Sequence, residues 1–206
     1  VVLEFTRSLS ALIRGVELDV ALDMCAVDDI AWKILQNIHG SFVASGTDDV
    51  VGAYSSDGDL QDAAALAEQA CELLTVVRSS APSRYTTLSN DALYNDRVVH
   101  LLCEYSRMPN ELLDMWMSDG NEFITAEMDA VPCCGLRHSA ADVIDSSCTG
   151  SQGTIYTSFF SLLQRTAQSL FALDIAADDT ESIARRFEGV LWLLSPVVRN
   201  YQKILR

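Results

Sequence analysis

The stretch of residues 59–79, DLQDAAALAEQACELLTVVRS, carries the clearest structural pattern of the chain. Its apolar residues recur at every third or fourth position, the period of one face of an α-helix: Leu60, Ala64, Ala67, Cys71 and Leu74. Asp59 is placed to cap the start of such a helix, and Pro82 follows soon after its end. The segment therefore predicts a helix whose apolar face packs against another part of the protein.

The same period recurs outward from this stretch in both directions, and strand alternation is almost absent. Helical stripes mark residues 9–16, 28–45, 91–107, 110–118, 136–147, 155–173 and 183–194. Pro196 is expected to end or kink the last helix. Polar loops are expected at 45–58, 82–90, 119–135 and 174–180. These patterns predict an all-α protein.

Consecutive helices with one or two apolar sides favour an α-solenoid of HEAT type, a right-handed superhelix of helical hairpins. The hairpins are expected to start near residues 1, 58, 110 and 154, within one segment spanning 1–206. A compact helical bundle would show similar stripes and stays open as the alternative. Because the chain begins Val1-Val2 and closes in a helical pattern, we expect it to be a piece of a longer solenoid.

Charge narrows the range of partners. The chain has 14 Lys and Arg against 29 Asp and Glu, a formal charge of −15. This balance argues against direct binding of nucleic acid, which depends on clustered Lys and Arg residues.

The apolar content limits the class of protein. At 49% apolar residues the chain is too hydrophobic to be disordered. Its apolar runs are short, so no membrane insertion is expected. The six cysteines fit apolar helix positions, which favours reduced thiols in a cytosolic or nuclear protein.

Sequence motifs for catalysis are mostly missing. There is no P-loop, no dinucleotide-binding glycine motif and no zinc-protease motif, and no cofactor is expected. Cys133 and Cys134, with His138 close by, could form a nucleophile and base, so a small helical enzyme remains an alternative. A zinc site needs four well-spaced ligands, which this group does not supply. We therefore expect a protein that is not an enzyme and holds no metal.

Acidic residues are concentrated in four stretches. Residues 16–31, 45–62, 110–130 and 172–182 hold 20 of the 29 acids and contain no Lys or Arg. Such surfaces attract basic partners, although solubility alone could also explain them. The candidate partner-binding acids are Asp48, Asp49, Asp57, Asp59, Asp174, Asp178, Asp179 and Glu181.

Residues 105–144 carry a more specific pattern. A helix after Pro109 ends near a Trp, an Asp and a Phe-Ile step follow, then an acidic stretch, and an Arg opens the next helix: Trp116, Asp119, Phe123, Ile124, Glu127, Asp129 and Arg137. This pattern resembles the importin-β (karyopherin) family of nuclear transport receptors, in particular members that import histones and other basic cargo. The Arg137 helix continues Ser139-Ala140-Ala141-Asp142, as in that family.

The resemblance implies Ran-dependent import of a basic protein cargo such as histones or ribosomal proteins. It also implies shuttling between cytoplasm and nucleus, contact with nucleoporins, and a main Ran GTPase site outside this chain. Exporters share parts of the pattern, so the direction of transport stays open. A HEAT-type scaffold or adaptor without a transport role is the alternative.

The family-motif residues have a physical interpretation of their own. Trp116 and Phe123 flank a turn at 118–121, where both rings could pack under the connection between helices. Arg137 could then pair with Glu127 or Asp129 across that connection. These roles are structural. Alternatively, Trp116 beside acids could stack on a Lys or Arg of the cargo.

Overall fold

A computed structural model describes residues 24–45, 62–80, 92–108, 110–128, 135–149, 154–172 and 180–204. In this part of the chain all regular structure is helical, which confirms the all-α prediction. The helices are α2 (Met24–Ser45), α3 (Asp62–Ser80), α5 (Ala92–Tyr105), α6 (Asn110–Ser118), α7 (Gly120–Met128), α8 (Gly135–Thr149), α9 (Thr154–Ala172) and α10 (Thr180–Ile204). The stripe at 59–79 thus belongs to α3.

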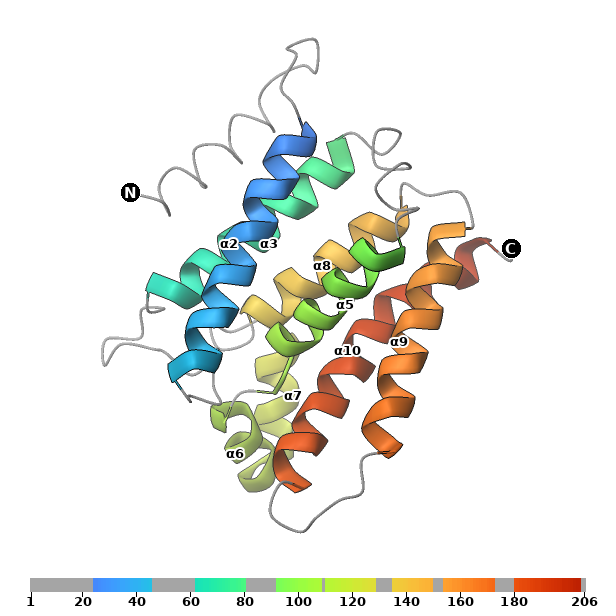
Figure 1. Ribbon diagram of the computed structural model, residues 1–206. Helices are drawn as coiled ribbons and strands as arrows, with labels where there is room; N and C mark the ends of the chain where they lie inside the picture. Colours follow the sequence, from blue (N-terminus) through green and yellow to red (C-terminus); the bar gives the residue numbers. More distant parts are fainter. Residues whose placement is uncertain are drawn as a thin grey trace.

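Six of these helices form the body of the molecule, where α2 packs on α3, α9 packs on α10, and α5 lies against α9, α10 and α8 (Figure 1). In one layer α3 packs along α8, and α8 packs along α10. In the other layer α5 packs against α9 and touches α2 more lightly. The most extensive packing joins α3 to α8, so contacts remote in sequence hold the body together.

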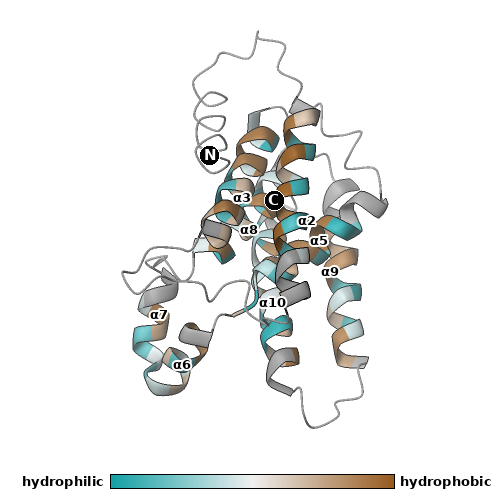
Figure 2. Cartoon of the chain, turned by 60° about the vertical axis from the view of Figure 1, so that its left-hand side comes forward, coloured by the Kyte–Doolittle hydropathy of each residue, from teal (hydrophilic) through white to brown (hydrophobic). Residues whose placement is uncertain are grey.

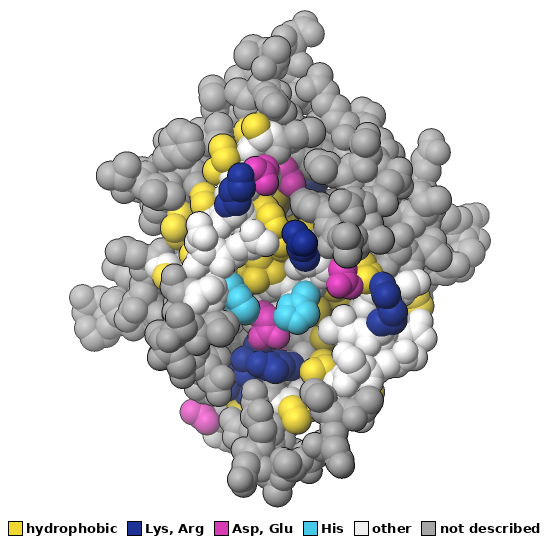
Figure 3. All heavy atoms as spheres, in the orientation of Figure 1, with side chains coloured by type: hydrophobic (Ala, Val, Ile, Leu, Met, Phe, Trp, Pro, Cys, Tyr) yellow, Lys and Arg dark blue, Asp and Glu magenta, His cyan; other side chains and the backbone are white. Residues whose placement is uncertain are grey.

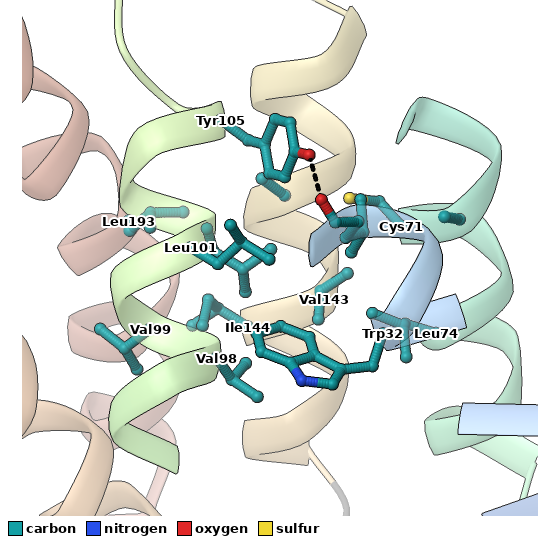
Figure 4. Close-up of a cluster of buried hydrophobic side chains, with 14 of the residues drawn as sticks. Trp32, Cys71, Leu74, Val98, Val99, Leu101, Tyr105, Val143, Ile144 and Leu193 are labelled. Carbon is teal, nitrogen blue, oxygen red and sulfur yellow. Dashed lines mark hydrogen bonds between the residues drawn. The ribbon is translucent and has the colours of Figure 1, made fainter. Parts of the chain in front are cut away.

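The core lies between the two layers, where apolar stripes from all six helices meet. Leu35, Leu74, Leu102, Ile144 and Leu193 are fully buried in it. Figure 4 shows this cluster, with side chains from α2, α3, α5, α8 and α10 converging. Removal of such side chains from water is the main source of folding free energy.

Two buried polar side chains, Tyr105 and Arg78, form hydrogen bonds between helices of the core. The Tyr105 hydroxyl donates to the Leu35 carbonyl oxygen at 2.7 Å, so the end of α5 is tied to α2 (Figure 4). Arg78 on α3 donates to Asp28 on α2 at 3.4 Å and to the Ser147 hydroxyl on α8 at 2.6 Å. Because an unpaired buried charge is costly, this arginine specifies how the three helices lie together.

The hairpin starts expected near residues 58, 110 and 154 stay a prediction. In the structure α3 packs on α2 and α8, α8 packs on α3 and α10, and α9 packs on α10. The expected start near residue 1 lies outside the described residues.

One local expectation is wrong, because the predicted loop at 119–135 contains helix α7. Pro196, which was expected to end or kink the last helix, does not end it, since α10 continues through Pro196 to Ile204. Proline removes one backbone donor, a cost that the packing of the surrounding helix can outweigh. The neighbouring Val197 is buried against the core, which supplies such packing. No helix within the described ranges has both the length and the apolar character needed to cross a membrane.

Candidate protein-binding hairpin

The short helices α6 and α7 form a separate hairpin that stands away from the body. Figure 2 shows the two helices below and beside the main group of helices. They pack mainly on each other. Their own small core consists of the buried Met108 and Leu112, with Leu113, Met115 and Phe123 packed around them. The hairpin therefore owes little of its stability to the large core.

Asp119 is the residue that makes the second helix of the hairpin possible. Its Oδ1 accepts hydrogen bonds from the backbone N–H groups of Asn121 at 2.9 Å and Glu122 at 3.2 Å. Its backbone N–H donates to the Met115 carbonyl at 2.8 Å, which closes the end of α6. Asp at an N-cap position with Glu three residues later is a helix-start signal. This signal in the sequence predicts the start of α7. An interpretation of residues 118–121 only as a turn does not include this helix.

Trp116 and Phe123 come together across the connection between α6 and α7. Their ring centroids lie 5.7 Å apart at an interplanar angle of 28°, a stacked pair. Phe123 is half-buried, but Trp116 keeps 53% of its surface exposed. The two rings therefore pack across the connection between α6 and α7 on its solvent-exposed side, and not in a buried position beneath it. One side of the Trp116 indole remains accessible to another molecule.

The exposed surface of the hairpin combines apolar and acidic side chains. Met117 is 79% exposed and Ile124 is 53% exposed, on the same two helices as Trp116. Asp114 and Glu122 are exposed on the same two helices. Residues 110–128 contain five acids and no Lys or Arg: Glu111, Asp114, Asp119, Glu122 and Glu127. Apolar side chains surrounded by one sign of charge are typical of a protein-binding surface.

The base of the hairpin is held firmly by α10. Arg185 is buried and its Nε donates to the Met108 carbonyl at 2.7 Å. Gly189 lies against the backbone at Ser106, where an added Cβ would come within 2.8 Å of the carbonyl oxygen. A side chain at this position would push α10 off the turn. The hairpin is therefore presented at a fixed position on the body, although its own helices project outward.

Arg137 is fully buried at the start of α8 and its Nη2 donates to Glu188 on α10 at 2.6 Å. Its guanidinium also lies over the Trp192 ring, 4.8 Å from the centroid, and the Trp192 indole N–H donates to the Arg137 carbonyl at 3.3 Å. These contacts join α8 to α10. The expected pairing of Arg137 with Glu127 or Asp129 involves side chains outside those that the structure describes and stays a prediction.

The structure brings together Trp116, Asp119 and Phe123 among the predicted site residues. Glu127 and Glu181 lie in α7 and α10, and their side chains are outside what the structure describes. The remaining predicted acids also fall outside the described residues: Asp48, Asp49, Asp57, Asp59, Asp129, Asp174, Asp178 and Asp179. Their role as a partner-binding surface stays a prediction.

The thiol alternative receives no geometric support from the described residues. Cys133 and Cys134 lie outside them, and His138 packs edge-on against Trp192 with ring centroids 5.1 Å apart. Cys71 and Cys103 are free thiols, and burial raises the pKa of each to about 12, so neither is a reactive thiolate near neutral pH. No group of three metal-ligating side chains occurs in the described ranges.

Comparison with protein-family models, with curated proteins and with solved structures yields no match to this chain.

Proposed function

We propose that this chain is a segment of a HEAT-type solenoid receptor that binds a basic protein partner without catalysis, and that the α6–α7 hairpin is a contact surface for that partner. The observation that carries the proposal is the hairpin itself. It exposes Trp116, Met117 and Ile124 together with Asp114, Asp119 and Glu122, and residues 110–128 contain no Lys or Arg. A basic partner would relieve the repulsion among these acids while its apolar side chains cover the exposed ones.

The stacking of the body supports the solenoid part of the proposal. α3, α8 and α10 lie in one layer of the body, and α2, α5 and α9 lie in the other. Repeat proteins likewise bury a continuous core between layers of stacked helices. The resemblance of residues 105–144 to importin-β receptors includes the hairpin, and it favours basic nuclear cargo such as histones.

Neutralisation of the hairpin tests the proposal. Asp114→Asn, Asp119→Asn and Glu122→Gln remove three charges, and Asn at 119 keeps the helix cap because it is as good an N-cap as Asp. A labelled histone-type peptide rich in Lys and Arg should bind this triple variant about tenfold more weakly, at roughly 0.5 kcal/mol for each exposed pair. The measurement is fluorescence anisotropy at low salt.

The matched control is Asp142→Asn, which removes an exposed acid from α8 on the body. It should leave binding of the basic peptide unchanged, and both variants should keep the parent melting temperature. Trp116→Ala should also weaken binding, since it removes the exposed ring from the centre of the surface. Equal binding by the parent, the triple variant and Trp116→Ala would reject the hairpin as the contact surface.

The same binding experiment also tests the predicted acidic residues at 172–182. Asp174, Asp178, Asp179 and Glu181 are replaced together by Asn or Gln. Weaker binding of the basic peptide would assign these residues to the surface as well. Full binding would leave the interaction to the hairpin alone.

A second experiment, on the full-length receptor, distinguishes a transport role from a scaffold role. Purified Ran loaded with GTP should release a basic protein from an importer, whereas a scaffold or adaptor should hold it regardless of Ran. The readout is the amount of labelled basic protein retained on the immobilised receptor with and without Ran. Retention in both conditions would favour the scaffold.

A further inference from the structure

Two grooves flank α5 on the face of the body that Figure 3 shows. One, of about 480 Å³, lies between α2 and α5. The other, of about 330 Å³, lies where α5 meets α9 and α10. Asp96 and His100 line both grooves, so the two meet over an exposed ridge of α5. α2 and α5 pack only lightly against each other, and this leaves the first groove open.

The grooves have apolar floors and polar rims. Trp32 and Leu101 are nearly buried at the bottom of the first groove, and Cys103 and Val190 are nearly buried at the bottom of the second. Polar and charged side chains stand at the edges. Two adjoining shallow grooves of this kind suit an extended peptide, whose alternate side chains can face the floors and the rims.

The charge of the rims is opposite to that of the whole chain. Three arginines line the grooves, Arg97, Arg165 and Arg186, against two acids, Asp96 and Glu104. Arg97 and Arg165 are exposed. The Glu104 carboxylate is already compensated, because Arg107 and Arg186 each lie 3.7 Å from it.

Two histidines lie among these charged side chains. His39 lines the first groove and His100 lines both, and histidine side chains lie beside an acidic one at the middle of this face (Figure 3). Apart from the histidines, the lining side chains carry one net positive charge. The chain as a whole has a formal charge of −15, so a local excess of positive charge indicates a partner of the opposite sign from that of the hairpin.

We propose that the two grooves beside α5 bind a short, extended acidic segment of a partner protein, with its carboxylates at Arg97 on one side of the α5 ridge and at Arg165 on the other. The molecule would then carry two binding surfaces of opposite preference. The acidic hairpin takes a basic segment, and the α5 grooves take an acidic one.

The experiment uses a short fluorescein-labelled peptide of alternating Glu and Leu, with the corresponding Gln–Leu and Lys–Leu peptides as probes of charge. The Glu peptide should bind the parent protein, and the other two should bind at least tenfold more weakly. Charge reversal by Arg97→Glu or Arg165→Glu should weaken binding of the Glu peptide by about fivefold each. The effect should diminish at 1 M salt, where the Debye length falls to about 3 Å.

Arg199→Glu is the matched control, since Arg199 is an exposed arginine of α10 that lies outside both grooves. This variant should bind the Glu peptide like the parent. All three substituted arginines are exposed, so the melting temperatures should stay within a few degrees. Equal affinity for the Glu and Gln peptides, or unchanged binding by the Arg97→Glu/Arg165→Glu double variant, would overturn the proposal. Neither result bears on the hairpin, whose test uses a basic peptide.

Discussion

The body and the α6–α7 hairpin are both helical, yet they are stabilised in different ways. In the body, Leu35, Leu74, Leu102 and Leu193 are fully buried among side chains from other helices. Among the hairpin side chains that the structure describes, Met108 and Leu112 are the buried ones, and the second helix depends on the Asp119 cap. Helices of similar local character thus belong to a scaffold in one region and to an exposed surface in the other. This difference is the physical basis for assigning binding to the hairpin.

The largest expected effect is from a substitution in the core of the body. Leu102→Ala should lower the free energy of unfolding by about 2–5 kcal/mol, because a fully buried Leu leaves a cavity. Met117→Ala in the hairpin removes a side chain that is 79% exposed and should change stability by less than about 0.5 kcal/mol. Urea unfolding of the two variants measures both values. Similar losses in the two would contradict the contrast between the regions.

The second effect concerns the buried ion pair between α8 and α10. Arg137→Met should destabilise the protein by about 3 kcal/mol, the low end of the range for breaking a buried pair, since Glu188 is 29% exposed. The double variant Arg137→Met/Glu188→Leu should recover part of this loss, because no charge is left without its partner. Thermal or urea unfolding of the single and the double variant measures both changes in stability. If Arg137→Met were as stable as the parent, Arg137 would not contribute to the stability of the contact between α8 and α10.

The third effect is local to the hairpin. Asp119→Ala should destabilise α7 by about 1 kcal/mol through loss of its N-cap, whereas Asp119→Asn should be almost neutral. Hydrogen exchange should become faster for amides of α7 and stay unchanged for amides of α3 and α8. Equal acceleration in α3 and α8 would mean that the hairpin and the body unfold as one unit.

The smallest effect is a pH dependence of the body. Burial lowers the pKa of His39 below 6.5, with Glu104 opposing the shift and His100 and Arg186 adding to it. The unfolded chain therefore binds a proton more readily, so stability present above pH 6.5 is lost as pH falls through the folded pKa. His39→Gln should flatten the stability profile between about pH 5.5 and 7 in urea unfolding. Asp142 is a second group with a shifted pKa, which burial and the neighbouring Asp145 raise above its usual value. An unchanged profile would show that His39 does not contribute.

The extent of most helices could be predicted from the sequence. The period of apolar residues lies close to the observed bounds of α3, α5, α6, α8 and α9. α7 was missed because its start depends on one side chain, Asp119, within a stretch that also reads as a turn. The aromatic pair of Trp116 and Phe123 was predicted as well, since both residues flank the same short connection.

The sequence by itself determined the helical class, the acidic balance and the apolar stripe of each helix, because these depend on residues close together in the chain. Only the tertiary structure decided that α3 packs on α8, that Arg137 meets Glu188 and that Trp116 stays half exposed. A stripe shows that a helix has a buried side but does not show which helix covers it. Many pairings bury similar local areas, and the choice among them depends on how all six helices of the body fill one core at the same time.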